Sequence, residues 1–416
     1  MSVRPSPAKR LVLVGNGMAG MRAIEEIIAR APERYAVTIF GAEPHGNYDR
    51  ILLSSLLAGE KDFESILLHR RDWYQHHDIV LHAGERIIGI DRAANEVISE
   101  TGQRTAYDVL ILATGSLPIM LPIEGAALPG VLTFRTIADV KAMQQRAAEK
   151  SGKAIVIGGG LLGLEAAYGL KRQGMEVTVL HLMPHLMERQ LDPVAGAMLK
   201  QDLARRGIAV ITNACTEAIL GRNHVTGVVL ADGREIPADL IVMAIGIRPN
   251  VELARSCGLA VNRGIEVDDR LATSDPAIYA LGECVEHRGD IFGLVAPLYQ
   301  MARTLAERLC GNDHALYQTT TTATRLKVTG IDMFSAGDIY GDEDSEILMF
   351  RDAARGIYKR LVMRDTHLVG ALLYGEIRDG STYLDLMQKH YTIPAAREAL
   401  MFSPHMLENF AQEAEA

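Results

Sequence analysis

The residues whose spacing points most directly to chemistry are glycines in two turns of the form Gly-x-Gly-x-x-Gly. The turns consist of Gly15, Gly17 and Gly20 and of Gly158, Gly160 and Gly163. In such a turn the first glycine permits a tight bend, the second lets a phosphate approach the backbone, and the third lets a helix pack on a strand. Backbone N–H groups at the start of the helix then face the anion. Two matching turns therefore predict two pyrophosphate sites.

The residues that open the two helices should supply those N–H groups, namely Met18 and Ala19, and Leu161 and Leu162. Glu43 lies roughly the expected twenty residues downstream of the first turn, where a carboxylate would accept hydrogen bonds from ribose hydroxyls. A solvated loop acid is the alternative. The equivalent strand end in the second copy is His181, with Glu188 and Arg189 further on, so the usual acid that selects NADH is missing there. The choice between NADH and NADPH stays open.

The surroundings of the turns repeat as well. Each turn follows a short apolar run and precedes a helical pattern, and matching apolar runs ending in glycine occur at residues 109–115 and 240–246. Strands that are apolar throughout, alternating with helices, indicate parallel sheets covered on both faces. The repeat therefore predicts two βαβ nucleotide folds.

The length of 416 residues exceeds what one hydrophobic core usually supports. We expect the α/β class, with two Rossmann-like dinucleotide-binding domains and a C-terminal α+β domain. The predicted boundaries are 9–117 with 247–312 for a discontinuous first domain, 118–246 for the second and 313–416 for the third. In the third, residues 324–335, 346–351, 356–363 and 367–374 read as antiparallel strands, followed by helices at 381–390 and 394–401.

Charge and cysteine content exclude several classes of protein. The formal charge of -9 disfavours nucleic-acid or anionic-membrane partners, which need a clustered positive field. The four cysteines, widely spread from Cys215 to Cys310, fit neither a disulfide framework nor a thiolate metal site. With no signal segment or membrane span in the sequence, we expect a cytoplasmic protein.

The two turns, Ala113-Thr114-Gly115 and residues 273–283 together resemble the pyridine nucleotide-disulfide oxidoreductase superfamily, in its ferredoxin and rubredoxin reductase branch. The resemblance implies a glutathione-reductase-like fold, with FAD on the first nucleotide fold and NADH or NADPH on the second. It places Glu283 where an aspartate usually touches the FAD ribitol, Arg50 at the FAD pyrophosphate and Glu165 at the nicotinamide. A solvated loop cation is the alternative for Arg50, and a residue lining the first helical turn is the alternative for Glu165. The remaining cofactor-binding residues that we predict are Ala113, Thr114, Gly115, Gly246, Gly282 and Pro297.

Residues 48–55, 158–165, 187–192, 292–297 and 326–332 resemble more specifically the flavin half of assimilatory NAD(P)H nitrite reductases and the electron-transfer subunits of assimilatory nitrate reductases. This implies an FAD-dependent NAD(P)H:acceptor oxidoreductase of nitrate or nitrite assimilation. Its partner would be an iron-sulfur/molybdenum or sirohaem protein, and a homodimer or a complex with a reductase subunit is left open. Four scattered cysteines cannot hold a sirohaem and its cluster, so we expect this chain not to reduce nitrite alone.

The sequence argues against a thiol mechanism and against a metal centre. A redox thiol near residues 53–56 is excluded because the first cysteine is Cys215, and Cys284 is expected to be a small buried core residue. No metal site is expected at His69, His76 and His77, or His181 and His185. Two alternatives stay open: a rubredoxin or ferredoxin reductase of an oxygenase system, and a non-enzymatic nicotinamide-sensing scaffold. A basic rim for an acidic partner, or a solvated strand face, is expected from Arg351, Arg355, Lys359, Arg360 and Arg364.

Overall fold

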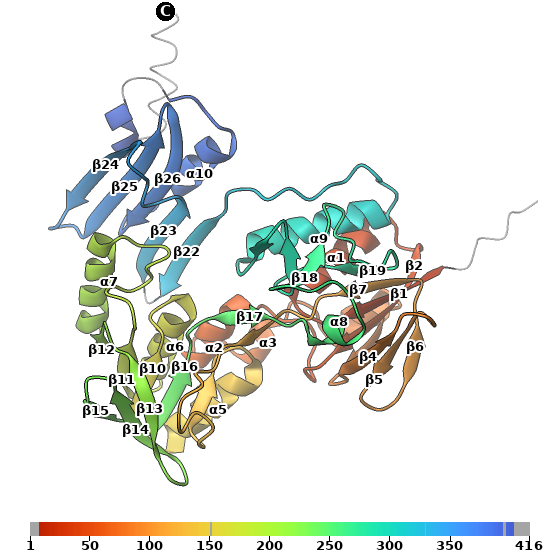
Figure 1. The fold of residues 1–416 in the computed structure, drawn as a ribbon, viewed down its shortest axis with the longest axis horizontal. Helices are drawn as coiled ribbons and strands as arrows, with labels where there is room; N and C mark the ends of the chain where they lie inside the picture. Colours follow the sequence, from red (N-terminus) through yellow and green to blue (C-terminus); the bar gives the residue numbers. More distant parts are fainter. Residues whose placement is uncertain (1–7, 150–151, 329, 394–396, 403–416) are drawn as a thin grey trace, which may run out of the picture. The chain divides into compact units, whose positions relative to one another are not determined.

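The computed structural model describes residues 8–149, 152–328, 330–393 and 397–402, which form two compact units. Unit 1 contains the described residues of Met1–Leu53, Lys61–Leu117 and Ile247–Thr319. Unit 2 contains those of Ser54–Glu60, Pro118–Gly246 and Thr320–Ala416. Each unit is built around a parallel sheet (Figure 1).

The parallel sheet of unit 1 has five strands in the order β19-β7-β1-β2-β3. Its strands are β1 (Lys9–Val14), β2 (Tyr35–Gly41), β3 (Val80–Ala83), β7 (Val109–Leu112) and β19 (Ile278–Ala280). All four neighbouring pairs run parallel. Every residue of β7 is buried, because helices and loops cover both faces of the sheet.

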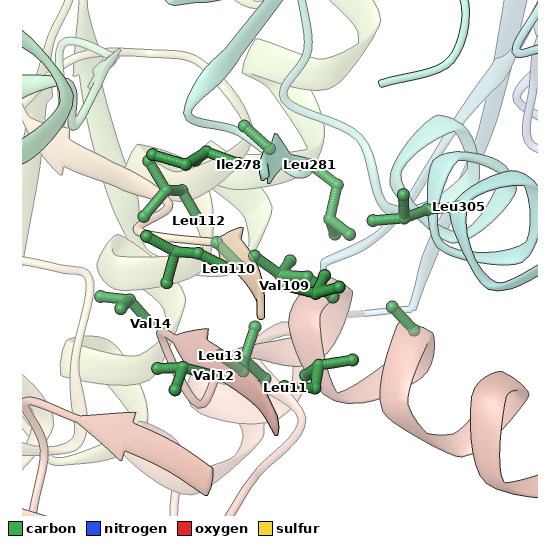
Figure 2. Packing of buried hydrophobic residues seen from close by; sticks show 14 of the residues in the cluster. Leu11, Val12, Leu13, Val14, Val109, Leu110, Leu112, Ile278, Leu281 and Leu305 are labelled. Atoms are coloured by element: carbon green, nitrogen blue, oxygen red, sulfur yellow. The ribbon is translucent and has the colours of Figure 1, made fainter. Parts of the chain in front are cut away.

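Helices α1 (Met18–Arg30) and α9 (Val295–Leu309) pack beside this sheet and against each other. Figure 2 shows the side chains of β1 and β7 packed together with Ile278 of β19 and Leu305 of α9. The remaining helices of this part of the chain are η1 (Arg50–Leu52), α2 (Leu53–Leu57, at the boundary with unit 2), α3 (Phe63–Ile66), α4 (Arg71–His76) and α8 (Glu252–Ser256). Small sheets are formed by β4 (Ile87–Asp91), β5 (Glu96–Ser99) and β6 (Arg104–Ala106), by β18 (Ile265–Val267), β20 (Val285–His287) and β21 (Asp290–Ile291), and by β8 (Ser116–Pro118) with β17 (Ile247–Pro249).

The parallel sheet of unit 2 repeats this design, in the order β9-β16-β10-β11-β12. Its strands are β9 (Val131–Thr133), β10 (Lys153–Ile157), β11 (Glu176–Leu180), β12 (Ile208–Ile211) and β16 (Leu240–Met243). The helices around it are α5 (Ile137–Glu149), α6 (Leu161–Arg172) and α7 (Pro193–Arg205), and an antiparallel sheet is added by β13 (Thr216–Gly221), β14 (Val225–Leu230) and β15 (Glu235–Pro237). In both units the strand before the glycine turn lies at the centre of the sheet.

A second sheet of unit 2, here called the C-terminal sheet, is antiparallel in the order β22-β23-β26-β25-β24. Its strands are β22 (Ala323–Val328), β23 (Ile331–Gly337), β24 (Ser345–Asp352), β25 (Ile357–Arg364) and β26 (His367–Tyr374), followed by α10 (Gly380–Gln388) and η2 (Arg397–Met401). The prediction of one strand over 324–335 is wrong, because β22 and β23 pair as a hairpin and Gly330 has a φ of +75°. Residues 394–396 of the last predicted helix lie outside the described residues.

The predicted fold class is confirmed: two Rossmann-like folds are followed by an α+β region. The structure groups the second Rossmann-like fold and the C-terminal sheet in one unit, and the division into three domains stays a prediction. In the part of the chain that the structure describes, no helix is both long and apolar enough to cross a bilayer.

Candidate functional site: two glycine turns

The first glycine turn is bent tightly between β1 and α1. Gly15 has a φ of +112°, and its N–H donates to the Phe40 carbonyl at 2.8 Å. A Cβ on Gly15 would lie 2.1 Å from the Ala113 carbonyl oxygen, and one on Gly20 would lie 2.9 Å from the Gly15 carbonyl oxygen. Both positions therefore require glycine, one for conformation and close approach and the other for packing.

The second turn has nearly the same geometry. Gly158 has a φ of +122°, and its N–H donates to the Leu180 carbonyl at 2.8 Å. A Cβ on Gly158 would lie 2.2 Å from the Ala244 carbonyl oxygen, and one on Gly163 would lie 2.0 Å from the Gly158 carbonyl oxygen. The internal repeat read from the sequence is thus a repeat of backbone structure.

The middle glycines differ from the others because space lies beside them. A Cβ on Gly17 or on Gly160 would meet no other described atom within 4 Å. Each of these glycines is the N-cap of a helix, and the helices begin with Met18 and Ala19 and with Leu161 and Leu162. Open space at the N-terminus of a helix, where N–H groups are free of intrahelical partners, fits a pyrophosphate. The residues present at both turns therefore fit a bound dinucleotide.

Beyond β2, Glu43 and Arg50 are partners. Arg50 Nη2 lies 2.5 Å from Glu43 Oε1, and the hydroxyl of Tyr48 donates to Glu43 Oε2 at 2.9 Å. Arg50 Nη1 also donates to the Tyr48 hydroxyl at 2.8 Å. Desolvation lowers the pKa of Arg50, but Tyr48 and Glu43 outweigh it and raise the pKa above its ordinary value. Arg50 is therefore not a solvated loop cation, and it stays charged beside an acid that retains exposed area.

Around the end of β7, several predicted residues come together in unit 1. The Thr114 hydroxyl donates to the Asn250 carbonyl at 2.6 Å, and the Asn250 N–H donates to the Gly115 carbonyl at 2.9 Å. Gly282 has a φ of +94°, and a Cβ there would lie 3.2 Å from the Cβ of Ala19 at the start of α1. Glu283 thus follows a residue that touches the first turn.

Some residues that support these sites were not predicted. The Ser116 hydroxyl donates to Glu283 Oε2 at 2.8 Å, which fixes one carboxylate oxygen. Asn16, inside the first turn, donates from Nδ2 to the His45 carbonyl at 3.2 Å and accepts from the Tyr74 hydroxyl at 3.1 Å. Its polar side chain between two glycines of the turn is a sequence signal from which a supporting role of Asn16 could have been predicted. Nothing local to Ser116 indicates its role, because its partner is distant in sequence.

At the second turn, His181 occupies the end of β11 as predicted. Its Nδ1 accepts from the Gly159 N–H at 3.0 Å, and its Nε2 lies 3.0 Å from Glu188 Oε2. The carboxylate that the sequence lacks at the strand end is therefore brought there from Glu188. Sequence spacing missed it because the loop between the two residues folds back.

Of the remaining predicted residues, Glu165 lies in α6, where burial raises its pKa to about 7. Gly246 has a φ of +128°, and its carbonyl accepts from the Ile119 N–H at 3.0 Å. Pro297 is buried in the first turn of α9. Cys284 is fully buried, as expected for a core residue, and burial raises the pKa of its thiol.

The structure excludes two of the five residues from the predicted basic rim, Lys359 and Arg360, whereas Arg351 and Arg355 are exposed and Arg364 is partly exposed. Lys359 is only 4% exposed, and its Nζ lies 2.9 Å from Asp379 Oδ2. Arg360 is directed to the backbone, since its Nε donates to the Ile339 carbonyl at 2.8 Å. These two side chains stabilise the C-terminal sheet, so they cannot attract a partner from its surface. Among the described residues, no group of three or more histidine, cysteine or acidic side chains is placed to hold a metal ion.

The two parallel sheets share four strands in the same order, β7-β1-β2-β3 and β16-β10-β11-β12, and each carries a glycine turn open to an anion. This arrangement defines an oxidoreductase that binds two dinucleotides. Residues 9–307 match the family model described as pyridine nucleotide-disulphide oxidoreductase, and the chain belongs to this family. Its cofactors are FAD and a nicotinamide coenzyme. Residues 323–391 match a second model, described as the rubredoxin NAD+ reductase C-terminal domain.

The similar proteins include an NAD(P)H nitrite reductase of Bacillus subtilis, which is 48% identical over 95% of this chain and 49% of the relative. The assimilatory nitrate reductase electron transfer subunit of Bacillus subtilis is 45% identical over 94% of this chain and 51% of the relative. Among solved structures, a ferredoxin reductase from Rhodopseudomonas palustris is 27% identical, with a TM-score of 0.83 over 93% of this chain and 98% of that one. The chain spans about half the length of the two Bacillus relatives.

Proposed function

We propose that this chain oxidises NADH or NADPH and delivers the electrons through FAD to a separate metalloprotein of nitrate or nitrite assimilation. The observation that carries the proposal is the pair of equivalent glycine turns, each open at its middle glycine. Relatives that are 48% and 45% identical, a nitrite reductase and a nitrate reductase electron transfer subunit, support the choice of pathway.

The chain's own residues bind and orient in this proposal. The first turn, with Glu43 and Arg50 beyond it, holds FAD, and Glu283 contacts its ribitol. The second turn holds the coenzyme, and Glu165 meets the nicotinamide. The flavin held there would supply the change from two-electron hydride oxidation to the single-electron transfer that a metal centre requires. The residues of both turns would act by binding and orienting the two ligands.

The acceptor is the part of the proposal that needs a direct test. FAD-loaded protein is reduced anaerobically by NADH or NADPH in a stopped-flow instrument, and reoxidation is then followed with one purified carrier at a time. The carriers are a molybdenum nitrate reductase subunit, a sirohaem nitrite reductase, a rubredoxin and a [2Fe-2S] ferredoxin. We expect reduction within milliseconds and the fastest reoxidation by one of the first two.

The match of residues 323–391 to a rubredoxin reductase domain supports a second candidate, a rubredoxin or ferredoxin reductase of an oxygenase system. Fastest reoxidation by rubredoxin or ferredoxin would establish that candidate instead. Slow reduction followed by a long-lived complex with coenzyme would contradict both and support a nicotinamide sensor. We further propose that the protein acts in the cytoplasm, where nicotinamide coenzymes are available to it.

A further inference from the structure

We propose that Glu188 binds the adenosine ribose of the coenzyme and selects NADH against NADPH, and that Tyr340 of the C-terminal sheet region positions it. The inference rests on the proposed function, because it concerns the same coenzyme site. It assigns a role to an acid that does not lie at the usual place, the end of the second strand.

The side chain of Glu188 is tied to the glycine turn through His181. Because the Gly159 N–H donates to His181 Nδ1 at 3.0 Å, that nitrogen carries no proton, and in the neutral ring Nε2 carries it. Nε2 then donates to Glu188 Oε2 at 3.0 Å. The side chain of His181 is 9% exposed and that of Glu188 is 30% exposed. The pair therefore holds a carboxylate beside the turn while leaving part of it accessible to a ligand.

The backbone before Glu188 is anchored on the same turn. Met187 has a φ of +53°, and its N–H donates to the Gly159 carbonyl at 3.1 Å. Leu186 is fully buried, and its side chain occupies the space that a Cβ on Gly159 would enter. The chain thus folds back from β11 onto the turn and brings Glu188 to the strand end.

The backbone at and after Glu188 is held by the region around the C-terminal sheet. The Tyr340 hydroxyl, between β23 and β24, lies 2.7 Å from the Glu188 carbonyl oxygen and 2.8 Å from that of Leu191. The Tyr358 hydroxyl on β25 donates to Asp192 Oδ2 at 2.6 Å. Asp192 in turn caps α7 by accepting from the Ala195 N–H at 2.9 Å. Two tyrosines therefore fix the segment that carries the acid.

A carboxylate at this position discriminates by charge. It accepts hydrogen bonds from a ribose 2′-hydroxyl, whereas it repels the 2′-phosphate of NADPH. Arg189, the next residue, is exposed and is the group that would favour the phosphate. Only Glu188 of these two is tied to the turn through its side chain by a hydrogen bond that the structure shows. The geometry therefore favours NADH.

Binding of ADP-ribose and of 2′-phospho-ADP-ribose to the FAD-loaded protein, measured by calorimetry, tests this without any hydride transfer. We expect the wild type to bind ADP-ribose at least about tenfold more tightly, and Glu188→Gln to reduce that preference about tenfold, since a charge-assisted hydrogen bond is lost and a repulsion removed. The control is Glu176→Gln, at the exposed start of β11, which should leave both affinities unchanged. Equal or tighter binding of the phosphorylated ligand by the wild type would overturn the proposal. An unchanged preference in Glu188→Gln would do the same.

The role of Tyr340 is tested through the preference itself. Tyr340→Phe should reduce the ratio of the two affinities about threefold, because the hydroxyl that contacts two carbonyl groups of the loop is removed. The melting temperature should stay near that of the wild type, because the side chain is exposed. Tyr391→Phe, an exposed tyrosine that also lies outside the parallel sheet of unit 2, is the control. An unaltered ratio in Tyr340→Phe would remove this residue from the proposal.

Arg189→Gln tests the competing interpretation, in which the loop selects NADPH through Arg189. If it weakens binding of the phosphorylated ligand while the wild type prefers that ligand, the loop selects NADPH and the proposal for Glu188 is wrong. The proposed function fails separately: a wild-type flavin that neither NADH nor NADPH reduces contradicts it. If NADH reduces the flavin but the preference for ADP-ribose is the same in wild type and Glu188→Gln, only this inference is contradicted.

Discussion

The two glycine turns are alike in backbone but differ in how an acid reaches the end of the second strand. In unit 1, Glu43 follows β2 almost directly and is held by Arg50 and Tyr48. In unit 2, Glu188 arrives after a folded loop and is held by His181. The order of four central strands and the geometry of the glycine turns are shared. The acids to which we assign the distinction between one nucleotide and another lie in the loops, where the two copies differ.

The largest effect should come from the first glycine of each turn. Gly15→Ala and Gly158→Ala should each lower the free energy of unfolding of their own unit by about 2–5 kcal/mol, from left-handed backbone strain and overpacking. Trp73, the single tryptophan, lies in unit 1, so its fluorescence in urea should report Gly15→Ala, while circular dichroism reports both variants. Similar fluorescence transitions for wild type and Gly15→Ala would contradict the strain seen at this turn.

The middle glycines should separate the two sites by function. Gly17→Val should retain less than about a tenth of the FAD, because the branched side chain fills the space of the pyrophosphate. Gly160→Val should stay yellow but should not be reduced by NADH. Absorbance at the flavin maximum and stopped-flow bleaching measure the two outcomes. A yellow Gly17→Val, or rapid bleaching of Gly160→Val, would show that the ligands are assigned to the wrong turns.

The acid of unit 1 gives a smaller effect. Glu43→Gln should weaken FAD binding about tenfold, since one charge-assisted contact to the ligand and the neutralising partner of Arg50 are lost. Equilibrium titration of the apoprotein with FAD measures this, with Glu33→Gln, on an exposed turn of the same unit, as the control. Equal affinities of wild type and Glu43→Gln for FAD would show that Glu43 is a solvated loop acid without a role in binding.

The smallest effect concerns pH. Burial raises the pKa of Glu165 from its ordinary 4.5 to about 7, so the native state favours the protonated carboxyl. Its stabilising contribution is therefore present below pH 4.5 and is lost as pH rises toward 7. Glu165→Gln should remove this dependence and raise the melting temperature of unit 2 at pH 8 by about 2–4 °C. Parallel melting curves for wild type and variant across pH 5–8 would contradict it.

The sequence by itself determined the parallel folds and the position of both glycine turns. Glycine spacing and continuous apolar strands are local signals, because backbone conformation and burial on both sheet faces constrain each residue individually. The same locality explains the error at residues 324–335, where two strands of similar composition read as one and the turn near Gly330 was not recognised.

Only the tertiary structure decided which polar groups act together. Ser116 meets Glu283, and Tyr340 meets the backbone of Glu188, across intervals of sequence that carry no spacing rule. Lys359 is excluded from the predicted basic rim for the same reason, since it is neutralised by Asp379 in the interior. The role of a charged or polar side chain depends on the partner that folding brings to it. The conformation of a glycine turn depends mainly on its own backbone, which is why the sequence indicates it.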